Sequence, residues 1–398
     1  TVSAPLAQSI QQAAPQLAQY PSSKAIFFKG DTPLQVGDKW VQSDLAWSLS
    51  QIAKQGPRAF YQGKIADKIT DFMSKNAGLI TAKDLRRYQA KTRDPIKGEY
   101  QNYTVYTMPP PSSGGVHLVQ MLNVLDQVSL AQMGHNSAET IAWLTESMRV
   151  AYADRSKYLG DPDFVQVPVD WLTSSRYADQ TRSDILNKGR RSSDEVQPGV
   201  PHSIYEGDQT THFTVVDQWG NMVSNTYTLN FSFGNKIVVP GTGILLNNQM
   251  DDFSAKPGVP NAYGLIGGEF NAIEPEKRML SSMTPTLVLK DEQPWLATGS
   301  PGGSRIITTV LQILLNCATF DMNIADATVA TRIHHQWRPD YIRVESGLSS
   351  DTRFLLEAQG YQLKVQRAMG GTNSIMRENS QLSGYSDPRK PGSLTMGL

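Results

Sequence analysis

Cysteine is almost absent from this chain: its 398 residues contain one, Cys317. No intrachain disulfide can form, and the thiol lies in the apolar stretch IITTVLQILLNCATF (residues 306–320). A buried core position is expected there rather than a nucleophile. The stretch also contains Thr, Gln and Asn and is too short to cross a bilayer. The sequence therefore predicts no membrane span, and no signal peptide is visible.

An excess of positive charge is also missing. Lys plus Arg and Asp plus Glu both number 37, so the formal net charge is zero. A general nucleic-acid-binding protein needs cations that neutralise phosphates, and the balance predicts that nucleic acid is not a partner. The remaining composition, with 39% hydrophobic and 19% charged residues, is typical of a soluble globular protein.

Clusters of metal ligands are lacking as well. His334 and His335 are adjacent, so on regular structure their side chains point in different directions, and no further ligands follow at a suitable spacing. The acidic stretch ADRSKYLGDPDF (residues 153–164) lacks the residue order of a calcium-binding loop. We therefore predict that the protein holds neither a metal ion nor a cofactor.

The pattern of secondary structure changes near residue 210. Before this point helical periodicity dominates, and EYQNYTVYTMPP (residues 99–110) is the one clear strand. Residues 186–209 are polar and rich in Ser, Pro and Gly, which is typical of an exposed linker. After this point short β-like runs alternate with turns, and two helices are expected, at 304–319 and about 350–359. In the first half, helices are expected at residues 44–56, 64–78, 117–127 and 137–160.

The stretch YEGDQTTHFTVVDQWGN (residues 205–221) predicts a hairpin whose first strand begins with threonine. Phe213–Val216 and Met222–Tyr227 flank a five-residue loop that contains Gly. If Val216 pairs with Met222, the register places Thr210 opposite Thr228. One strand face then carries seven polar side chains, and a solvated face is the plain alternative to a site. Those side chains are Thr210, His212, Thr214, Ser224, Thr226, Thr228 and Asn230.

Three further stretches are unusually polar for their surroundings: GILLNNQMDDF (243–253), RMLSSMTPTLVL (278–289) and TGSPGGSRIITTV (298–310). In the last, Gly302 and Gly303 allow backbone N–H groups to converge just before a helix, whose N-terminus carries partial positive charge. Such a turn can hold an oxyanion. A structural turn remains the alternative for any one of these stretches. MPPPSSGG (108–115) is expected to end a strand and begin a helix.

Taken together, these motifs resemble the γ-glutamyltranspeptidases, and most closely the bacterial ones. The resemblance covers essentially the whole chain. It implies an α+β fold, the four-layer αββα sandwich of the N-terminal-nucleophile hydrolases. The matching segments are PPPSSGG (109–115), ADRSKYLGDP (153–162), TTHF (210–213), YTLN (227–230), LLNNQMDDFS (245–254), LSSM (280–283) and GSPGGSR (299–305).

The resemblance implies that a precursor cuts itself between Gln209 and Thr210. Residues 1–209 would then belong to a large subunit and residues 210–398 would form the small catalytic subunit. The Thr210 hydroxyl would be the nucleophile, and its new α-amine, with a pKa of about 8, would be the base. Thr228 would orient this amine. The oxyanion would be held by the N–H groups of Gly302 and Gly303.

The resemblance also implies a site for γ-glutamyl compounds such as glutathione. The γ-glutamyl group would pass from Thr210 to water or to an amino-acid or peptide acceptor. Polar side chains would hold the substrate: Asn230, Gln249 and Asp252 its α-amino group, and Ser281 and Ser282 its α-carboxylate, with Tyr263 on a lid loop.

The chain departs from the family's pattern at its start. Family precursors carry a further upstream region that supplies sandwich strands and an arginine for the α-carboxylate. We therefore expect that the upstream part of the large subunit is missing, and that residues 1–398 alone expose an apolar sheet face and are poorly soluble or inactive. The family's location predicts a periplasmic or secreted protein.

Two alternatives remain open. The first is a related cephalosporin or glutaryl acylase, which uses the same nucleophile but handles an acyl group without an α-amine. Such an enzyme has no use for an acid at position 252, so Asp252 favours the glutamyl specialist. The second alternative is a truncated or unprocessed chain without activity, and a denaturing gel would show it as one piece instead of two.

Overall fold

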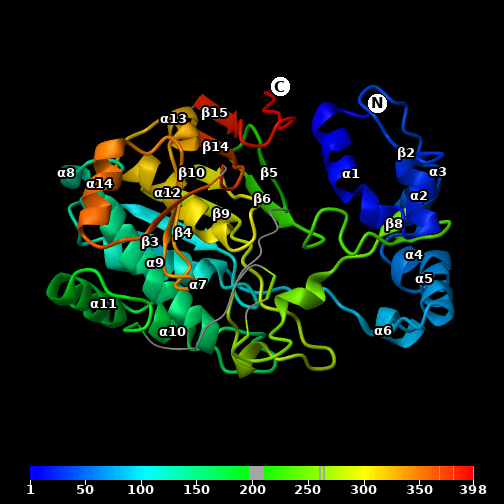
Figure 1. Ribbon diagram of the computed structural model, residues 1–398, viewed down its shortest axis with the longest axis horizontal. Helices are drawn as coiled ribbons and strands as arrows, with labels where there is room; N and C mark the ends of the chain where they lie inside the picture. Colours follow the sequence, from blue (N-terminus) through cyan, green and yellow to red (C-terminus); the bar gives the residue numbers. More distant parts are fainter. Residues whose placement is uncertain (197–209, 260, 263–264, 367, 380, 398) are drawn as a thin grey trace. The chain divides into compact units, whose positions relative to one another are not determined.

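The structure, a computed structural model, describes residues 1–196, 210–259, 261–262, 265–366, 368–379 and 381–397 (Figure 1). These residues form two compact units, one of residues 1–93 with 229–248 and one of residues 94–228 with 249–398. The predicted subunit boundary at residues 209 and 210 falls within the sequence range of the second unit. It therefore stays a prediction about cleavage.

The first unit is built from short helices and two small hairpins. Ser3 caps the first helix by accepting a hydrogen bond from the Leu6 N–H (3.4 Å). The apolar positions Ile10 and Leu17 of this helix are fully buried. The elements are α1 (Ala4–Leu17), α2 (Pro21–Phe27), β1 (Phe28–Lys29), β2 (Thr32–Pro33), α3 (Ser43–Gln55), α4 (Arg58–Tyr61), α5 (Lys64–Lys75), α6 (Ala82–Arg87), β7 (Val238–Val239) and β8 (Ile244–Leu245).

The second unit is organised around a six-stranded antiparallel sheet with the order β15-β14-β10-β9-β4-β3. A smaller sheet of three strands has the order β11-β12-β13. The strands are β3 (Ile96–Tyr100), β4 (Tyr103–Thr107), β5 (Thr211–Val216), β6 (Met222–Tyr227), β9 (Thr286–Lys290), β10 (Gln293–Thr298), β11 (Ile333–His334), β12 (Ile342–Glu345), β13 (Leu363–Gln366), β14 (Asn373–Glu378) and β15 (Gln381–Ser386).

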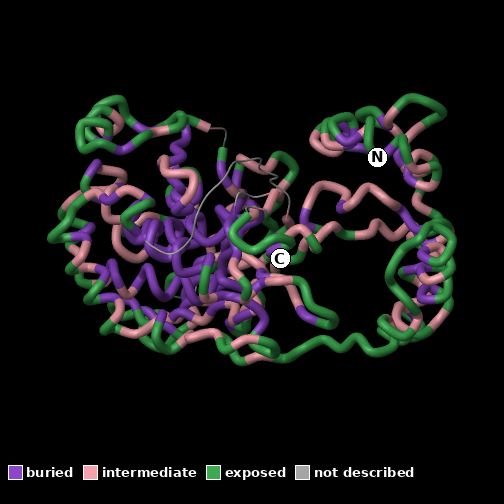
Figure 2. Tube along the Cα trace, turned by 60° about the horizontal axis from the view of Figure 1, so that its bottom comes forward, coloured by how far each residue is buried: buried purple, intermediate pink, exposed green. Residues whose placement is uncertain are grey.

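Helices cover this sheet through α7, which packs against β3 and β4. Gly98 permits a close approach, since a Cβ there would lie 2.6 Å from Cγ2 of Val119 on α7. In turn α9, α11 and α12 pack against α7. Most residues of α7, α9 and α12 are buried, whereas α11 buries Ala178, Thr181 and Ile185; buried stretches are purple in Figure 2. The helices are α7 (Gly114–Leu125), α8 (Leu130–Met133), α9 (Ala138–Tyr158), α10 (Val169–Leu172), α11 (Ser175–Lys188), α12 (Arg305–Ala318), α13 (Ile324–Val329) and α14 (Ser350–Ala358).

The hairpin of β5 and β6 packs against β14, β10 and β9. The second unit thus combines helices, an antiparallel sheet and a packed hairpin, and the prediction of an α+β fold is confirmed. None of the helices in the described part of the chain combines the length and the apolar character that a bilayer span requires.

Two predictions from the sequence pattern were wrong. The single strand expected at residues 99–110 is a hairpin, because Gln101 adopts a positive φ of 51° and turns the chain between β3 and β4. The linker expected at 186–209 is exposed only in part: residues 186–189 are exposed, but residues 191–196 include the buried Arg191, Ser193 and Val196. Residues 197–209 lie outside the described residues.

The segment 191–196 is held by Arg149 of α9 and by two residues from the far side of the predicted cleavage point, Trp337 and Asp340. The indole N–H of Trp337 donates to the carbonyls of Ser193 (2.9 Å) and Val196 (2.8 Å). The Ser193 hydroxyl accepts from Arg149 (2.6 Å), and the Ser193 N–H donates to Asp340 (2.8 Å). Polar composition therefore does not expose this segment, since other groups satisfy its backbone.

Candidate active site

The predicted register of the Thr210 hairpin is confirmed. Thr211 pairs with Tyr227 and Val216 pairs with Met222, which is the register that a five-residue loop predicts. Thr210 precedes β5 and lies across from Thr228, and its hydroxyl donates to Thr228 Oγ1 over 3.3 Å. The chain therefore brings two threonine hydroxyls together at the open end of this hairpin.

The polar face of the hairpin is turned inward, so the alternative of a solvated face is wrong. His212 is 2% exposed, and its ring nitrogens hydrogen-bond Thr226 (2.8 Å) and Thr214 (3.0 Å). Burial lowers the pKa of His212 to about 4, so the imidazole is neutral near neutral pH. It acts as a hydrogen-bonded core residue of the hairpin.

The opposite face of the same hairpin is apolar and exposed. Phe213, Val215, Val223 and Tyr227 each leave between 43% and 57% of their surface accessible. The expected exposed apolar sheet face is therefore present. Inward polar and outward apolar side chains reverse the usual arrangement of a strand at a protein surface.

The inward face of the hairpin joins it to the glycine-rich turn after β10. The Ser224 hydroxyl donates to the Thr298 carbonyl (2.8 Å) and accepts from the Thr286 N–H (3.1 Å). Gly299 lies directly against His212, since a Cβ at this position would be 2.3 Å from the ring carbon Cε1. Two motifs that are far apart in sequence therefore form one structural element.

Gly302 and Gly303 form the turn that precedes α12. Their φ angles are 135° and 55°, which residues with a side chain rarely adopt. Their carbonyls accept the N–H groups of Arg305 and Ile306 at the start of the helix. Neither glycine N–H donates to an acceptor within the described ranges, so both N–H groups are available to a bound anion.

The Ser281-Ser282 segment is fixed by the PPPSSGG motif. The Ser281 N–H donates to the Pro111 carbonyl (2.8 Å), and the Ser281 carbonyl accepts from both the N–H and the hydroxyl of Ser113 (2.9 Å each). The Ser112 hydroxyl donates to the Met283 carbonyl (2.7 Å). The motif does begin α7 as predicted, and it also holds this candidate site segment in place.

Both serine hydroxyls accept a hydrogen bond from the protein. Ser281 Oγ accepts from the Met283 N–H (3.1 Å), and Ser282 Oγ accepts from the Arg155 guanidinium (3.1 Å). Neither hydroxyl donates to a partner among the residues that the structure describes. Each hydroxyl hydrogen is therefore left to serve an external acceptor such as a carboxylate.

Arg155 is a residue of this site that the sequence interpretation missed. It lies in the last turn of α9, is 4% exposed, and donates through Nε to Ser113 Oγ (2.9 Å) as well as to Ser282. Burial lowers its pKa to about 10, so it stays positively charged. The only sequence signal was its place in the ADRSKYLGDP motif.

Asp252 supplies the opposite charge. Asp252 is the last residue of the 3₁₀ turn η1 (Gln249–Asp252), and the predicted Gln249 is the first residue of the same turn. Burial raises the pKa of Asp252 to about 7, while the charge of Arg155 opposes this rise. Asp252 and Arg155 therefore lie within electrostatic range of each other, in a region that also contains the two serines.

Two predicted site residues cannot be placed beside Arg155, Asp252 and the two serines. Asn230 belongs to the first unit, where it is 2% exposed and its amide donates to the Asn248 carbonyl (3.1 Å). Tyr263 lies outside the described residues, as does Gln209 on the far side of the predicted cleavage point. Their roles stay predictions.

The alternative nucleophile and the candidate metal ligands are engaged in the core. Cys317 is buried in α12, and burial raises the pKa of its thiol to about 12. His334 hydrogen-bonds Thr308 (2.8 Å) and Gln336 (3.0 Å) through its two ring nitrogens. Within the described ranges, no three His, Cys, Asp or Glu side chains are grouped so that they could hold a metal ion.

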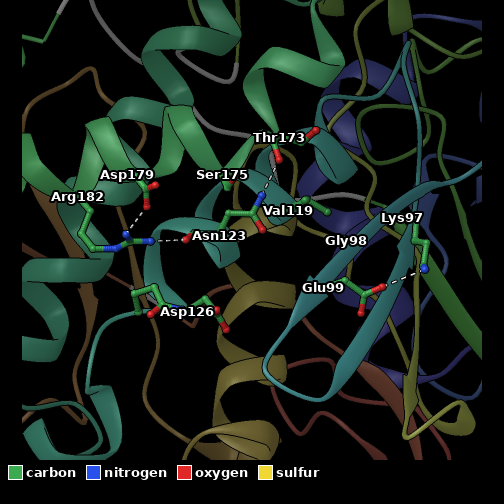
Figure 3. A pocket seen from close by; sticks show the side chains of 11 residues that line it. Lys97, Gly98, Glu99, Val119, Asn123, Asp126, Thr173, Ser175, Asp179 and Arg182 are labelled. Atoms are coloured by element: carbon green, nitrogen blue, oxygen red, sulfur yellow. Dashed lines mark hydrogen bonds and ion pairs between the residues drawn. The ribbon is translucent and has the colours of Figure 1, made fainter.

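A cleft of about 800 Å³ lies between α7, β3 and α11, and no predicted site residue lines it (Figure 3). Arg182 lines this cleft and donates to the carbonyls of Asn123 (2.8 Å) and Val124 (3.0 Å) at the end of α7. The guanidinium also pairs with Asp179 (2.7 Å). These contacts cap a helix, and the cleft is a feature of the surface rather than of the candidate site.

Comparison with known proteins gives one consistent result. The family model for gamma-glutamyltranspeptidase matches residues 1–397. The glutathione hydrolase proenzyme of Escherichia coli (strain K12) is 55% identical over 383 residues, covering 96% of this chain and 66% of that protein. The glutathione hydrolase proenzyme of Pseudomonas sp. (strain A14) is 42% identical over 387 residues, covering 94% and 67%.

A solved structure with a similar fold is the cephalosporin acylase from Bacillus halodurans. It has a TM-score of 0.82 and 26% sequence identity, and the match covers 98% of this chain and 70% of that one. The chain spans about two thirds of the length of the relatives that it matches.

Proposed function

The chain belongs to the gamma-glutamyltranspeptidase family, and we propose that it cleaves γ-glutamyl amides such as that of glutathione through an ester on Thr210. The observation that carries this proposal is the position of Thr210 at the start of β5, with its hydroxyl bonded to Thr228. The free N–H groups of Gly302 and Gly303 and the charged groups around Ser281 and Ser282 support it.

The first step is self-cleavage. The Thr210 hydroxyl attacks the carbonyl carbon of Gln209, the Gln209–Thr210 amide bond breaks, and the nitrogen of Thr210 becomes an amine. Water then hydrolyses the ester that this shift leaves on the Thr210 oxygen. Thr228 accepts a hydrogen bond from the Thr210 hydroxyl, which orients the attacking oxygen. The products are a chain that ends at Gln209 and a chain that begins at Thr210.

The same hydroxyl then acts on the substrate. Thr210 Oγ1 attacks the γ-amide carbon while the new α-amine takes the proton, because an α-amine has a pKa of about 8 and is a base near neutral pH. The N–H groups of Gly302 and Gly303 stabilise the oxyanion. The amine proton passes to the leaving amine, and the γ-glutamyl group stays on Thr210 as an ester. Water or the amine of an amino acid or peptide resolves this ester.

The substrate's head group carries one ammonium and one carboxylate, and the site offers a matching pair. Asp252 provides the negative charge for the ammonium. Ser281 and Ser282 provide two hydroxyl donors for the carboxylate. The family resemblance further predicts that Gln249 and Asn230 contact the ammonium and that Tyr263 belongs to a lid loop.

A cephalosporin or glutaryl acylase is the second candidate, since a cephalosporin acylase shares the fold. Its substrates carry a carboxylate but no α-ammonium, so they would leave the charge of Asp252 without a partner. Burying an unpaired carboxylate is costly. The opposed charges of Asp252 and Arg155 favour the γ-glutamyl substrate. The relatives' class also favours a periplasmic or secreted location.

The test is maturation followed by turnover. We expect the full-length protein to give two pieces on a denaturing gel, with the smaller one beginning Thr-Thr-His-Phe, and to hydrolyse glutathione. The Thr210→Ala variant should stay in one piece and be inactive. A Thr210→Ala protein that still matures and still cleaves glutathione would refute the proposal.

A further inference from the structure

Arg155 is a buried cation whose hydrogen-bond partners in the described part of the chain are neutral. Both of its hydrogen bonds go to hydroxyl groups, through Nε to Ser113 Oγ (2.9 Å) and through Nη2 to Ser282 Oγ (3.1 Å). The residue is 4% exposed. Taking a charge out of water costs free energy unless an opposite charge or strong hydrogen bonds compensate. Among the described residues the guanidinium hydrogen-bonds only hydroxyl groups, while Asp252 acts on it through electrostatics, and such a cation is suited to a site that receives an anion.

The hydrogen bonds of Arg155 also determine the direction of the hydroxyl hydrogens. Arginine can only donate, so Ser113 Oγ and Ser282 Oγ must accept from it. Ser113 then directs its own hydrogen to the Ser281 carbonyl (2.9 Å). Ser282 is left with a hydrogen that points away from Arg155. The guanidinium thus fixes the peptide of Ser281 through Ser113 and turns Ser282 into an oriented donor.

We propose that Arg155 is a positioning and specificity residue for carboxylate recognition, acting through Ser282 and Ser113 rather than by touching the substrate. This inference rests on the proposed function, because it assigns the α-carboxylate of the γ-glutamyl group to the two serines. The positive charge behind Ser282 makes its hydroxyl a stronger donor. It also biases the site toward acyl groups that carry a carboxylate.

Asp252 provides the second charged group of the site. The charges of Arg155 and Asp252 influence each other's pKa, so the site contains a positive and a negative end. An α-amino acid head group has the same two charges on one carbon atom. Arg155 therefore defines the carboxylate end, and the two ends together fix which way the head group lies.

Three anilides separate this role from a structural one. γ-Glutamyl-p-nitroanilide has both the carboxylate and the ammonium, glutaryl-p-nitroanilide has only the carboxylate, and 4-aminobutyryl-p-nitroanilide has only the ammonium. We would measure kcat and KM for each at about pH 8.5, where Asp252 is ionised, in full-length wild type and Arg155→Met.

We expect Arg155→Met to lower kcat/KM about tenfold to a hundredfold for the two substrates that have a carboxylate, the range for losing hydrogen bonds around a charged group. The change should appear mainly in KM. The 4-aminobutyryl substrate should change less than about threefold. An equal loss for all three substrates, or no loss for any, would overturn the proposal.

A double-mutant cycle tests the route through Ser282. If Arg155 acts by orienting that hydroxyl, then Arg155→Met should have little further effect on the glutaryl substrate once Ser282→Ala is in place. Full additivity of the two changes would contradict the route. Arg155→Lys serves as a second variant should Met prevent folding. Lysine keeps the charge but lacks the planar fork that reaches two hydroxyls, and we expect an intermediate loss in KM.

Arg182→Met is the matched control. Arg182 caps the end of α7, the helix that Ser113 precedes, and it is not part of the site (Figure 3). Its loss should lower the melting temperature without changing the ranking of the three anilides. Failure of the proposed function is distinguishable, because wild type would then not hydrolyse the γ-glutamyl anilide at all, whatever Arg155 does.

Discussion

Gly299 lies against the imidazole of His212, so closely that a Cβ would sit 2.3 Å from Cε1 and 2.5 Å from Nδ1. The ring cannot move aside freely, since both of its nitrogens are hydrogen-bonded to threonines of the same hairpin. This contact fixes the distance between the strand that follows Thr210 and the turn that contains Gly302. The proposed nucleophile and the proposed oxyanion donors are therefore linked by one packing contact.

Gly299→Ala should disturb this arrangement. The added methyl group must push His212 and the hairpin outward, which costs about 1–3 kcal/mol for an overpacked core. We expect a lower melting temperature and slower cleavage before Thr210, measured by the rate at which the two pieces appear on a gel. Gly397→Ala, with nothing within 4 Å of the added Cβ, is the control. Wild-type cleavage rates in Gly299→Ala would show that the contact does not position the nucleophile.

Thr228→Val should slow self-cleavage while keeping the shape of the side chain. The change removes the acceptor of the Thr210 hydroxyl, which is 3.3 Å away. We expect cleavage to slow by about tenfold to a hundredfold, the scale of losing one hydrogen bond of about 1–3 kcal/mol to the reacting hydroxyl. Thr228→Ser restores the hydroxyl and should recover most of the rate. Equal rates for Val, Ser and wild type would exclude Thr228 from the reaction.

Local patterns predicted the hairpin and its neighbours well. The register of β5 and β6 followed from a five-residue loop and the two-residue period of strands. The helix α12 (Arg305–Ala318) agreed with the expected 304–319 because a long apolar run with helical spacing leaves few alternatives. The turn at Gly302 and Gly303 was predicted because paired glycines before a helix are a local signal, and its role as an oxyanion site stays a prediction.

Long-range contacts explain what the sequence did not show. Arg155 and Ser282 are 127 positions apart, and no periodicity indicates which side chains of the mostly buried α9 face the serines. The segment 191–196 was misassigned for a related reason, since its polar composition suggested exposure. Trp337, more than a hundred residues later, supplies the donor that allows burial. The composition of a segment does not reveal which distant residues pack against it.

Trp337→Phe should loosen that segment. Phenylalanine keeps the ring but removes the indole N–H, which leaves the carbonyls of Ser193 and Val196 without this donor. An unsatisfied buried carbonyl costs about 1–3 kcal/mol. We expect a lower urea midpoint and faster proteolysis within residues 191–196. The exposed Trp219 offers a control, since Trp219→Phe should change neither property.

The apolar face of the hairpin should make residues 1–398 self-associate when they are produced alone. Val215 pairs directly with Val223, and both are more than half exposed. An exposed apolar strand face is an aggregation hazard. A Val215→Lys, Val223→Lys double variant should reduce light scattering and dye binding. Unchanged scattering would show that another surface is responsible.

We expect Asp252 to make the stability of the folded protein depend on pH. Burial raises its folded-state pKa to about 7, above the ordinary value near 4. Its contribution to stability is therefore fully present below about pH 4 and is lost as pH rises through about 7. Asp252→Asn does not titrate. Its melting temperature relative to wild type should rise between pH 4 and 8, and a constant difference would contradict the raised pKa.

Asp252→Asn also tests which acyl group the site accepts. The amide keeps the shape of the side chain but removes the charge that we propose as the partner of the substrate's ammonium. Hydrogen bonds to charged groups contribute about 1.5–3 kcal/mol, so kcat/KM for a γ-glutamyl anilide should fall roughly tenfold to a hundredfold. A glutaryl anilide lacks the ammonium and leaves the wild-type carboxylate unpaired, so the same change should be neutral or favourable for it. A change in the ratio of the two rates identifies Asp252 as the ammonium partner. Equal losses for both substrates would instead make Asp252 a structural residue and remove the main argument against an acylase.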